Sequence, residues 1–292
     1  MKLGFIGLGN IGKPMAKQWL KHGGGLTVFD MNPAAMDELA GLGATAVRTA
    51  GEVAGCSELI GLCVRDDQDV EALLDGCDGL LAHAATDSII AVHSTVRRDS
   101  ILRWASRAAE HGVHLIDAPI TGGAGGAAAG TLVYMAGGSP AIVDRCRAAF
   151  CAAGTLVHAG PLGAGIALKL CNNLMTYAAF AAIDEAAALA ARGGLELQQL
   201  IEVGRANGVV TPQMETFIVN RNKLAATGDS ALRAAFAPFA ALGRKDLAAA
   251  IASAEALDLP LPLTEKVTEL IEQVFLIPAA QRQREGTKCM AH

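Results

Sequence analysis

The segment GFIGLGNIGKPMAKQWL near the N-terminus constrains the fold more than any other part of the sequence. It places Gly7, Gly9 and Gly12 in G-x-G-x-x-G spacing, after a run of β-forming residues and before a helical pattern. In such a turn the first glycine permits the tight bend, the second lets a ligand approach the backbone, and the third lets helix and strand pack closely. The helix N-terminus then faces a bound anion. The segment predicts a strand–turn–helix unit that binds a pyrophosphate.

An acidic residue follows at the spacing that a dinucleotide site requires. Asp30 ends the β-rich run LTVFD, about 20 residues after the last glycine, where a carboxylate accepts hydrogen bonds from the ribose hydroxyls of NAD. The same carboxylate would repel the 2′-phosphate of NADP, and no arginine follows it in FDMNPAAM. We therefore predict NAD, with NADP the less favoured cofactor. A structural turn and an N-cap Asp before Pro33 would explain each feature separately, but not the spacing.

The pattern along the chain predicts two domains. In the first half, β-rich runs alternate with helical segments such as 14–21, 33–42 and 99–110, which is typical of βαβ units and a largely parallel sheet. The β-rich runs are KLGFIG, LTVFD, ELIGLCV, SIIAVHS, VHLIDAP and TLVYMAGG. The second half shows helical patterns only, over 165–192, 196–205, 211–224, 231–257 and 263–275. We predict an α/β chain with a Rossmann-type dinucleotide-binding domain (1–161) and an all-α substrate and oligomerisation domain (162–292).

Charge and hydropathy exclude several classes of partner. The net charge is −5 and no Lys/Arg cluster is present, so nucleic acid is not an expected partner. The Ala-rich stretch after Gly163 contains Lys169, two asparagines and two acids, which favours a buried helix over a membrane span. The N-terminal residues reach the glycine turn without the apolar stretch of a signal peptide. We expect a cytoplasmic protein that does not bind membranes.

The cysteines and histidines do not predict a metal site. There are seven cysteines, an odd number without a C-x-x-C pair, so neither a disulfide framework nor a zinc site is expected. We expect most of them to be small core residues. His111 and His114 lie three apart, but Gly112 between them ends a helix, which favours a surface turn.

A second glycine-rich stretch lies between two predicted strands. LIDAPITGGAGGAAAGTLVYMAGG could be a flexible linker, but strand-like runs precede and follow the glycines. Ligands bind at the carboxyl ends of strands in open α/β sheets. Thr121, Gly122 and Gly123 offer a hydroxyl and two unobstructed N–H groups there, and we interpret them as a carboxylate-binding site.

The helix that opens the second domain carries polar residues in an apolar segment. In GAGIALKLCNN, residues three and four apart share a helix face, so Lys169, Asn172 and Asn173 line one stripe. A lysine whose alkyl chain covers apolar surface and two capping amides would be the structural interpretation. A lysine desolvated in a closed site, with a pKa tuned to about 7 or 8, can instead act as a general base. Asn173 would then orient the substrate.

Four motifs together resemble one enzyme family over essentially the whole chain. GFIGLGNIGKPMA, DAPITGGAGGAAAGTL, GAGIALKLCNN and FAALGRKDL appear in the order found in the β-hydroxyacid dehydrogenases, which include 3-hydroxyisobutyrate dehydrogenase and tartronate semialdehyde reductase. The resemblance implies that Lys169 is the catalytic lysine and Asn173 its substrate-binding partner, and that Thr121, Gly122 and Gly123 bind the substrate carboxylate. It also implies that Thr95 lies beside the nicotinamide and that Lys245 reaches the cofactor and substrate.

The sequence departs from the family pattern at two places. Thr121 stands where the family usually has serine, which keeps the hydroxyl but adds a methyl group. CVRDD replaces the usual Leu-Pro or Leu-Ser turn, so Arg65 either contacts the cofactor phosphates or faces solvent. Phe239 is either a core residue or a ring against the substrate. The candidate cofactor-binding residues are Gly7, Leu8, Gly9, Asn10, Ile11, Gly12, Asp30, Val64, Arg65, Thr95 and Lys245.

The motifs predict an NAD-dependent dehydrogenase that oxidises the β-hydroxyl of a small hydroxycarboxylate, or reduces the corresponding semialdehyde. Lys169 would be the general acid and base, and no metal is required. Two alternatives remain open. One is an imine reductase of the same architecture, although those relatives usually lack the lysine. The other is a dinucleotide-binding module without catalytic activity. The resemblance further implies a homodimer or homotetramer.

Overall fold

A computed structural model of the chain describes residues 1–276. The chain divides into two compact units, Met1–Lys169 and the residues from Leu170 onward, here called the N-terminal and C-terminal units. The predicted domain boundary after residue 161 lies in the turn before α9 (Ala164–Arg192), and the two units meet within that helix. The first turns of α9 therefore belong to the N-terminal unit.

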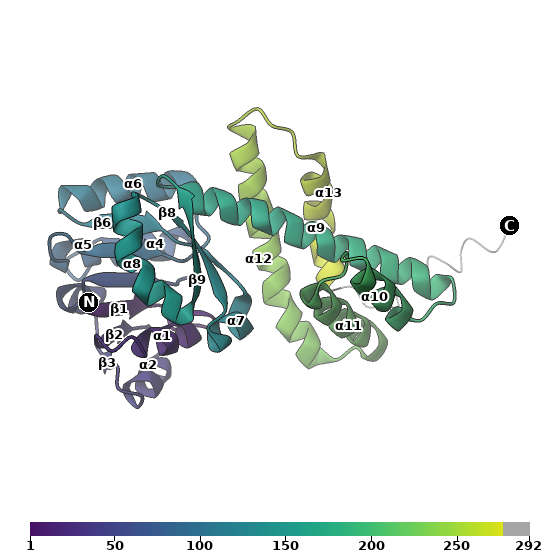
Figure 1. Cartoon of the computed structure of the whole chain (residues 1–292), viewed down its shortest axis with the longest axis horizontal. Helices are drawn as coiled ribbons and strands as arrows, with labels where there is room; N and C mark the ends of the chain where they lie inside the picture. The colour runs from purple at the N-terminus through teal and green to yellow at the C-terminus, as the bar shows by residue number, and fades with distance from the viewer. Residues whose placement is uncertain (277–292) are drawn as a thin grey trace. The chain divides into compact units, whose positions relative to one another are not determined.

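The N-terminal unit is built on a mostly parallel sheet (Figure 1). Its strands are β1 (Leu3–Ile6), β2 (Leu26–Phe29), β3 (Thr45–Ala46), β4 (Leu59–Leu62), β5 (Ile89–Val92), β6 (His114–Asp117), β7 (Ile120–Thr121), β8 (Leu132–Gly137) and β9 (Gly154–Gly160). The strand order is β3-β2-β1-β4-β5-β6-β8-β7, with β9 paired to β8. The strands from β3 to β6 are all parallel, so the loops that follow β1, β2, β4 and β5 lie at one edge of the sheet.

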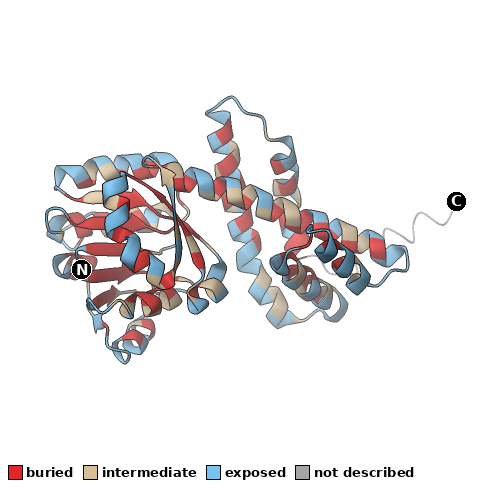
Figure 2. Cartoon of the chain, viewed as in Figure 1, coloured by how far each residue is buried: buried red, intermediate tan, exposed pale blue. Residues whose placement is uncertain are grey.

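Helices cover both faces of this sheet because its central strands are apolar throughout. In β1 the side of Gly4 faces Val53 of α3 (Ala50–Cys56), whereas the ring of the next residue, Phe5, packs against Trp19 of α1 (Gly12–Leu20). Adjacent strand residues point to opposite faces, so α1 and α3 lie on opposite sides. Figure 2 shows the buried strands between these layers. The helices are α1 (Gly12–Leu20), α2 (Pro33–Ala40), α3 (Ala50–Cys56), α4 (Asp67–Leu74), α5 (Leu80–His83), α6 (Arg98–Glu110), α7 (Gly123–Ala129) and α8 (Pro140–Ala153).

An aromatic cluster surrounds a buried histidine in the core of the N-terminal unit. His93, at the end of β5, is 3% exposed, and its Nδ1 bonds to the carbonyl oxygen of Ala118 at 2.8 Å. The rings of Tyr134 and Phe150 lie 5.4 Å from the imidazole. Burial lowers the pKa of His93 to about 4, because the charged form loses its hydration. The imidazole is therefore neutral at physiological pH.

The C-terminal unit consists of the remainder of α9 with α10 (Leu197–Ala206), α11 (Pro212–Thr227), α12 (Ser230–Glu255) and α13 (Pro262–Leu276). Thr211 and Asp229 accept hydrogen bonds from the first-turn N–H groups of α11 and α12, so each helix begins where a side chain can cap it. Rings of Phe180, Phe217 and Phe275 pack together in the core, with centroid distances of 4.5 to 5.9 Å.

A buried arginine also connects the helices of this unit. Arg221 of α11 is 3% exposed, and its Nε donates to the Val274 carbonyl at 2.7 Å. Its guanidinium lies 3.8 Å from the buried carboxylate of Asp184 on α9. Because a buried charge needs both a counter-ion and hydrogen-bond partners, this arrangement connects α9, α11 and the last turn of α13.

The predicted strands and helices agree with the structure to within a few residues, with specific differences. The helix α7 was not expected in the glycine-rich stretch, and the short strands β3 and β7 carry no periodic signal. Phe239 is 51% exposed, so its interpretation as a core residue is wrong. By length and composition alone α9 could cross a membrane, with 33% of its most apolar window buried; core helices of water-soluble proteins pass the same test.

The prediction that most cysteines are core residues is also wrong. Cys146 is buried and Cys63 is half-buried, whereas four others are exposed on helix surfaces and in a loop: Cys56, Cys77, Cys151 and Cys171. Cys289 lies outside the described residues. Within residues 1–276, no group of three metal-ligating side chains comes together. His114 instead bonds to Asp87 at 2.9 Å.

Candidate functional site

The glycine turn between β1 and α1 is compact because two of its glycines have no room for a side chain. Gly7 has a φ of +92°, and a Cβ there would overlap the carbonyl oxygen of Cys63 on the neighbouring strand's loop. A Cβ on Gly12 would overlap the carbonyl oxygen of Gly7. Gly9 differs, since no atom lies within 4 Å of its Cβ position. Two glycines thus shape the turn, and the third leaves space in front of it.

That space is a pocket of about 290 Å³ beside the start of α1. It is lined by Leu8, Gly9, Asn10, Lys13, Asn32, Ala34, Ala35 and Glu38. Ile11 is the N-cap of α1, and among the described residues no side chain caps this helix end. The first N–H groups of α1 and its positive dipole end therefore suit a phosphate. These residues fit the pyrophosphate and adjoining ribose of a dinucleotide.

Asp30 fixes the turn against the next strand. One carboxylate oxygen, Oδ2, accepts from the N–H of Leu8 at 2.5 Å, and the other, Oδ1, accepts from the N–H of Asn32 at 2.7 Å. Asn32 in turn caps α2, so the N-cap role belongs to Asn32 and not to Asp30. The carboxylate lies beside the pocket, where the sequence predicts that it binds a ribose.

Among the described residues that line this pocket, Lys13 is the only cation, and it is paired with Glu38. Glu38 Oε2 accepts from Lys13 Nζ at 2.7 Å and Glu38 Oε1 accepts from Lys17 Nζ at 2.5 Å. These two ammonium groups lower the pKa of Glu38 to about 2. A 2′-phosphate in this pocket would have to compete with Glu38 for these two ammonium groups.

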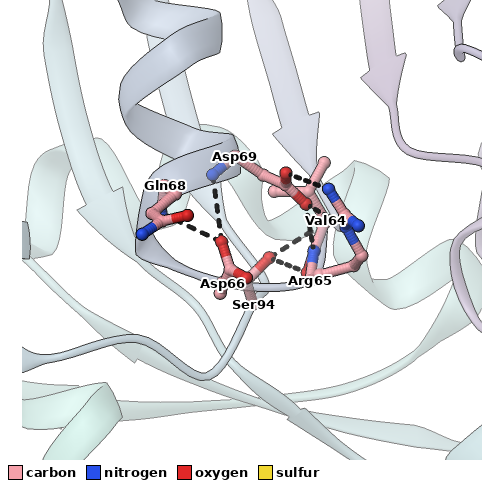
Figure 3. Close-up of polar contacts among 6 residues, drawn as sticks. All are labelled: Val64, Arg65, Asp66, Gln68, Asp69 and Ser94. Carbon is pink, nitrogen blue, oxygen red and sulfur yellow. Dashed lines mark hydrogen bonds and ion pairs between the residues drawn. The ribbon is translucent and has the colours of Figure 1, made fainter.

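The loops after β4 and β5 are joined by one serine (Figure 3). Ser94 Oγ accepts from the N–H of Val64 at 2.9 Å and donates to its carbonyl oxygen at 2.7 Å. Because Ser94 directly precedes Thr95, these bonds connect the loop that carries Val64 to the loop that carries the half-buried Thr95. Ser94 was missed by the sequence analysis; its position at the end of a strand, directly before Thr95, is the signal that could have identified it.

Arg65 lies on the surface of the same loop. Its Nε and Nη2 each donate to a carboxylate oxygen of Asp69 at 2.7 Å, and the side chain is 85% exposed (Figure 3). Asp66 accepts from the N–H groups of Gln68 and Asp69 and begins α4. The bidentate ion pair restricts Arg65, but a surface pair of this kind exchanges easily for another anion.

The predicted carboxylate-binding residues lie where β7 turns into α7. Thr121 ends β7 and is half-buried, and Gly122 is the N-cap of α7 with a φ of +120°. Gly123 has a φ of +62°, with no atom within 4 Å of its Cβ position. The left-handed backbone that both glycines adopt would strain any other residue. Their binding of a carboxylate stays a prediction.

Lys169 and Asn173 lie one turn apart on α9. Lys169 is half-buried at the end of the N-terminal unit, and Asn173 is 6% exposed in the C-terminal unit. Asn173 Nδ2 donates to Asp246 Oδ2 at 2.7 Å, and its Oδ1 accepts from Asn172 at 3.3 Å. The amide orientation of Asn173 is thus set by a buried carboxylate on α12.

The remaining candidate, Lys245, precedes this carboxylate on α12. Its Nζ lies 3.8 Å from Asp246 Oδ1, so the two residues form an ion pair. Burial raises the pKa of the Tyr177 hydroxyl, and the charge of Asp246 raises it further. The structure therefore groups Asn173, Lys245 and Asp246 in the C-terminal unit, and the glycine turn, Asp30, Val64 and Thr95 in the N-terminal unit.

Comparison with known proteins identifies both halves of the chain. Residues 2–175 match the family model described as the NAD binding domain of 6-phosphogluconate dehydrogenase. Residues 163–286 match the one described as the NAD-binding domain of NADP-dependent 3-hydroxyisobutyrate dehydrogenase. An NAD-dependent L-serine dehydrogenase of Pseudomonas aeruginosa is 40% identical, over 70% of this chain and 69% of its own.

Solved structures agree with this comparison. A Mycobacterium tuberculosis 3-hydroxyisobutyrate dehydrogenase with L-serine has a TM-score of 0.79 at 28% identity, covering 93% of this chain and 92% of that one. A Streptomyces aurantiacus imine reductase has a TM-score of 0.66 at 19% identity, over 94% of each chain, which is a likeness of fold alone.

Proposed function

Because the chain belongs to the β-hydroxyacid dehydrogenase family, we propose that it is an NAD-dependent enzyme acting on the β-hydroxyl of a small hydroxycarboxylate. It would oxidise this group to an aldehyde or ketone, or catalyse the reverse reduction. The main support is the arrangement on α9, where Asn173 is held by the buried Asp246 one turn beyond Lys169. A buried amide with a fixed orientation suits substrate binding, and an amine on the same helix face suits proton transfer.

NAD would be held by the glycine turn, Asp30 and the loops after β4 and β5. The open space at Gly9 and the uncapped start of α1 suit its pyrophosphate, and the Asp30 carboxylate suits a ribose with free hydroxyls. NAD over NADP is favoured by the same carboxylate and by the pairing of Lys13 with Glu38. Bound NAD would supply the hydride acceptor for oxidation.

Two groups of residues are candidates for binding the substrate. We assign its carboxylate to the Thr121 hydroxyl and the N–H groups of Gly122 and Gly123, because successive N–H groups in a turn with positive φ angles can form a concave site for an anion. The Asn173 amide nitrogen carries two hydrogens and gives one of them to Asp246, so its second N–H can donate to the substrate hydroxyl oxygen. The single proton of that hydroxyl would then point to Lys169, which would accept it as hydride leaves the β-carbon.

The names of two relatives narrow the substrate class. The P. aeruginosa relative is an L-serine dehydrogenase, and the M. tuberculosis structure contains L-serine with a 3-hydroxyisobutyrate dehydrogenase. L-serine and 3-hydroxyisobutyrate both have a carboxylate and a primary hydroxyl on the β-carbon. We propose that this chain acts on the same class of compound, whose α-carbon carries a methyl, hydroxyl or amino substituent. We also propose that the active protein is a homodimer or homotetramer.

A substrate panel tests the proposed function. Purified protein would be incubated with 3-hydroxyisobutyrate, L-serine or glycerate and with NAD or NADP, while NADH or NADPH absorbance is recorded. We expect turnover with at least one β-hydroxy acid and higher kcat/KM with NAD. 2-Hydroxy acids such as lactate serve as controls, since their hydroxyl lies on the wrong carbon.

The same assay separates the alternatives. An imine reductase would oxidise NADPH with a cyclic imine and leave the β-hydroxy acids unchanged. A non-catalytic module would bind NADH, as seen by its fluorescence, without turnover of any compound in the panel. Either result would overturn the proposed function.

A further inference from the structure

A buried carboxylate connects the sheet to the helix that carries Lys169. Asp117, the last residue of β6, is 0% exposed. Its Oδ1 accepts from the N–H of Gly163 at 2.7 Å, and its Oδ2 accepts from the N–H of Ile166 at 2.8 Å. Both donors lie at the beginning of α9. One side chain thus satisfies two N–H groups that the helix itself leaves without acceptors.

Two glycines make room for this contact. A Cβ on Gly137, at the end of β8, would overlap Asp117 Oδ1. A Cβ on Gly165, in the first turn of α9, would overlap the carbonyl oxygen of Met135 and lie 2.9 Å from Asp117 Oδ2. The carboxylate is therefore enclosed by the main chain of β8 and α9. A residue larger than glycine at position 137 or 165 would overlap it or the neighbouring main chain.

The charge of Asp117 matches its surroundings. The first turn of a long helix carries a partial positive charge, which stabilises an anion placed there. Burial raises the pKa of Asp117, while the N–H groups of Gly163, Ile166 and Gly165 act in the opposite direction. Burying a carboxylate costs free energy unless the carboxylate is well paired. A neutral or solvent-exposed side chain could cap the same helix at a lower cost, so the use of a buried carboxylate calls for an explanation.

The consequence concerns Lys169. It follows Ile166 by three residues, less than one helical turn, so its Cα position is determined by the turn that Asp117 holds. We propose that Asp117 is a positioning residue: by fixing the first turn of α9 to β6 and β8, it holds the amine of Lys169 at the place where it accepts the substrate proton. The positioning role of Asp117 rests on the proposed function of Lys169. The contact of Asp117 with Gly163 and Ile166 does not depend on that function.

A double-mutant cycle tests whether Asp117 acts through Lys169. The variants are Asp117→Asn, which keeps the shape but replaces one acceptor oxygen by a donor, Lys169→Ala, and the two combined. We expect Asp117→Asn to lower kcat by about tenfold to a hundredfold, as displacement of a catalytic group by about 1 Å does. NADH affinity should stay unchanged. The double variant should be no slower than Lys169→Ala alone. Full additivity of the two losses would overturn the proposal.

Gly165→Ala gives a second variant if Asp117→Asn folds poorly. It leaves the carboxylate in place but pushes α9 away from β8, and it should lower kcat in the same non-additive way. Gly55→Ala is the matched control, because no atom lies within 4 Å of the Cβ position of Gly55 in α3. It should retain wild-type kcat. A wild-type kcat for Gly165→Ala would contradict the proposal.

Hydrogen exchange separates failure of this proposal from failure of the proposed function. In Asp117→Asn, the amides of residues 163–169 should exchange faster, while those of β1 and β4 keep their protection. If Lys169→Ala retains wild-type turnover, the proposed role of Lys169 is refuted. The exchange result then tests only the anchor, which is the contact of Asp117 with the first turn of α9. Unchanged protection of residues 163–169 would refute the anchor itself.

Discussion

The glycine turn of the N-terminal unit and Asn173 of the C-terminal unit are held in place by different means. In the N-terminal unit the turn is shaped by main-chain atoms, because a side chain at Gly7 or Gly12 would overlap a carbonyl oxygen. In the C-terminal unit Asn173 is oriented by the side chain of Asp246, 73 positions away in sequence. A site shaped by the backbone is encoded locally and recognised from glycine spacing. A site held by side chains depends on packing between distant helices.

The sharpest test of this contrast lies within the glycine turn. Gly12→Ala forces a Cβ onto the Gly7 carbonyl oxygen and should destabilise the protein by about 3 kcal/mol, with loss of NADH binding. Gly9→Ala places its methyl group in open space, so the Tm should equal that of wild type while NADH binds more weakly. Thermal denaturation and NADH fluorescence titration measure both. A Gly9→Ala variant as unstable as Gly12→Ala would contradict the different roles assigned to them.

The next largest effect concerns pH and the core of the N-terminal unit. The folded pKa of His93 is lowered to about 4 from 6.5, so between these values the unfolded chain binds one proton more than the folded chain. The contribution of neutral His93 to the free energy of unfolding is fully present above pH 6.5. It is lost as the pH drops from 6.5 to 4, which lowers the free energy of unfolding by roughly 3 kcal/mol.

Urea unfolding at several pH values checks this. His93→Phe keeps an aromatic ring but cannot titrate, so its free energy of unfolding should fall less steeply over the same pH range than that of wild type. Equal slopes for the two proteins would rule out His93 as the source. The comparison uses the slopes, because loss of the bond to Ala118 lowers the stability of the variant at every pH.

In the C-terminal unit, Asp246→Asn should impair catalysis without weakening cofactor binding. The amide cannot accept as strongly as the carboxylate, and Asn173 loses its fixed orientation. We expect kcat/KM to fall about thirtyfold, corresponding to about 2 kcal/mol. Asp229→Asn makes the same change at the N-cap of the same helix and should retain kcat/KM. Equal losses in both variants would show that α12 is merely destabilised.

The smallest effect is expected at the pocket beside the glycine turn. Glu38→Gln removes the carboxylate that pairs with Lys13 and Lys17, so these cations become available to a 2′-phosphate. The ratio of NADP to NAD activity should rise by about threefold or less, since all three groups are exposed. Glu110→Gln, outside the pocket lining, is the control with the same change in charge. An unchanged ratio would mean that Asp30 alone sets the preference.

Much of the N-terminal unit could be predicted from the sequence because its signals are local. The apolar runs that became β1, β4 and β5, and the glycine spacing, each follow from neighbouring residues. The helices of the C-terminal unit were also predicted within a few residues, since Pro, Gly and capping residues mark their ends.

The contacts that complete the site could not be predicted in this way. Ser94, after β5, bonds to Val64, after β4, and Asp117 bonds to Ile166, 49 positions later. Neither contact can be predicted from the periodicity of neighbouring residues. The exposed cysteines show a related limit. Composition predicts an average burial for a residue type, whereas the burial of each cysteine depends on the helix face or loop in which it lies.

The most direct test of the account is the rescue of Lys169→Ala by small amines. If Lys169 accepts the substrate proton, kcat of this variant with the best β-hydroxy acid and NAD should fall by about a hundredfold or more. Methylamine or ethylamine should then restore part of the rate in proportion to amine concentration, with no effect on the wild-type enzyme. Turnover close to wild type in the variant, without dependence on amine, would contradict the central claim.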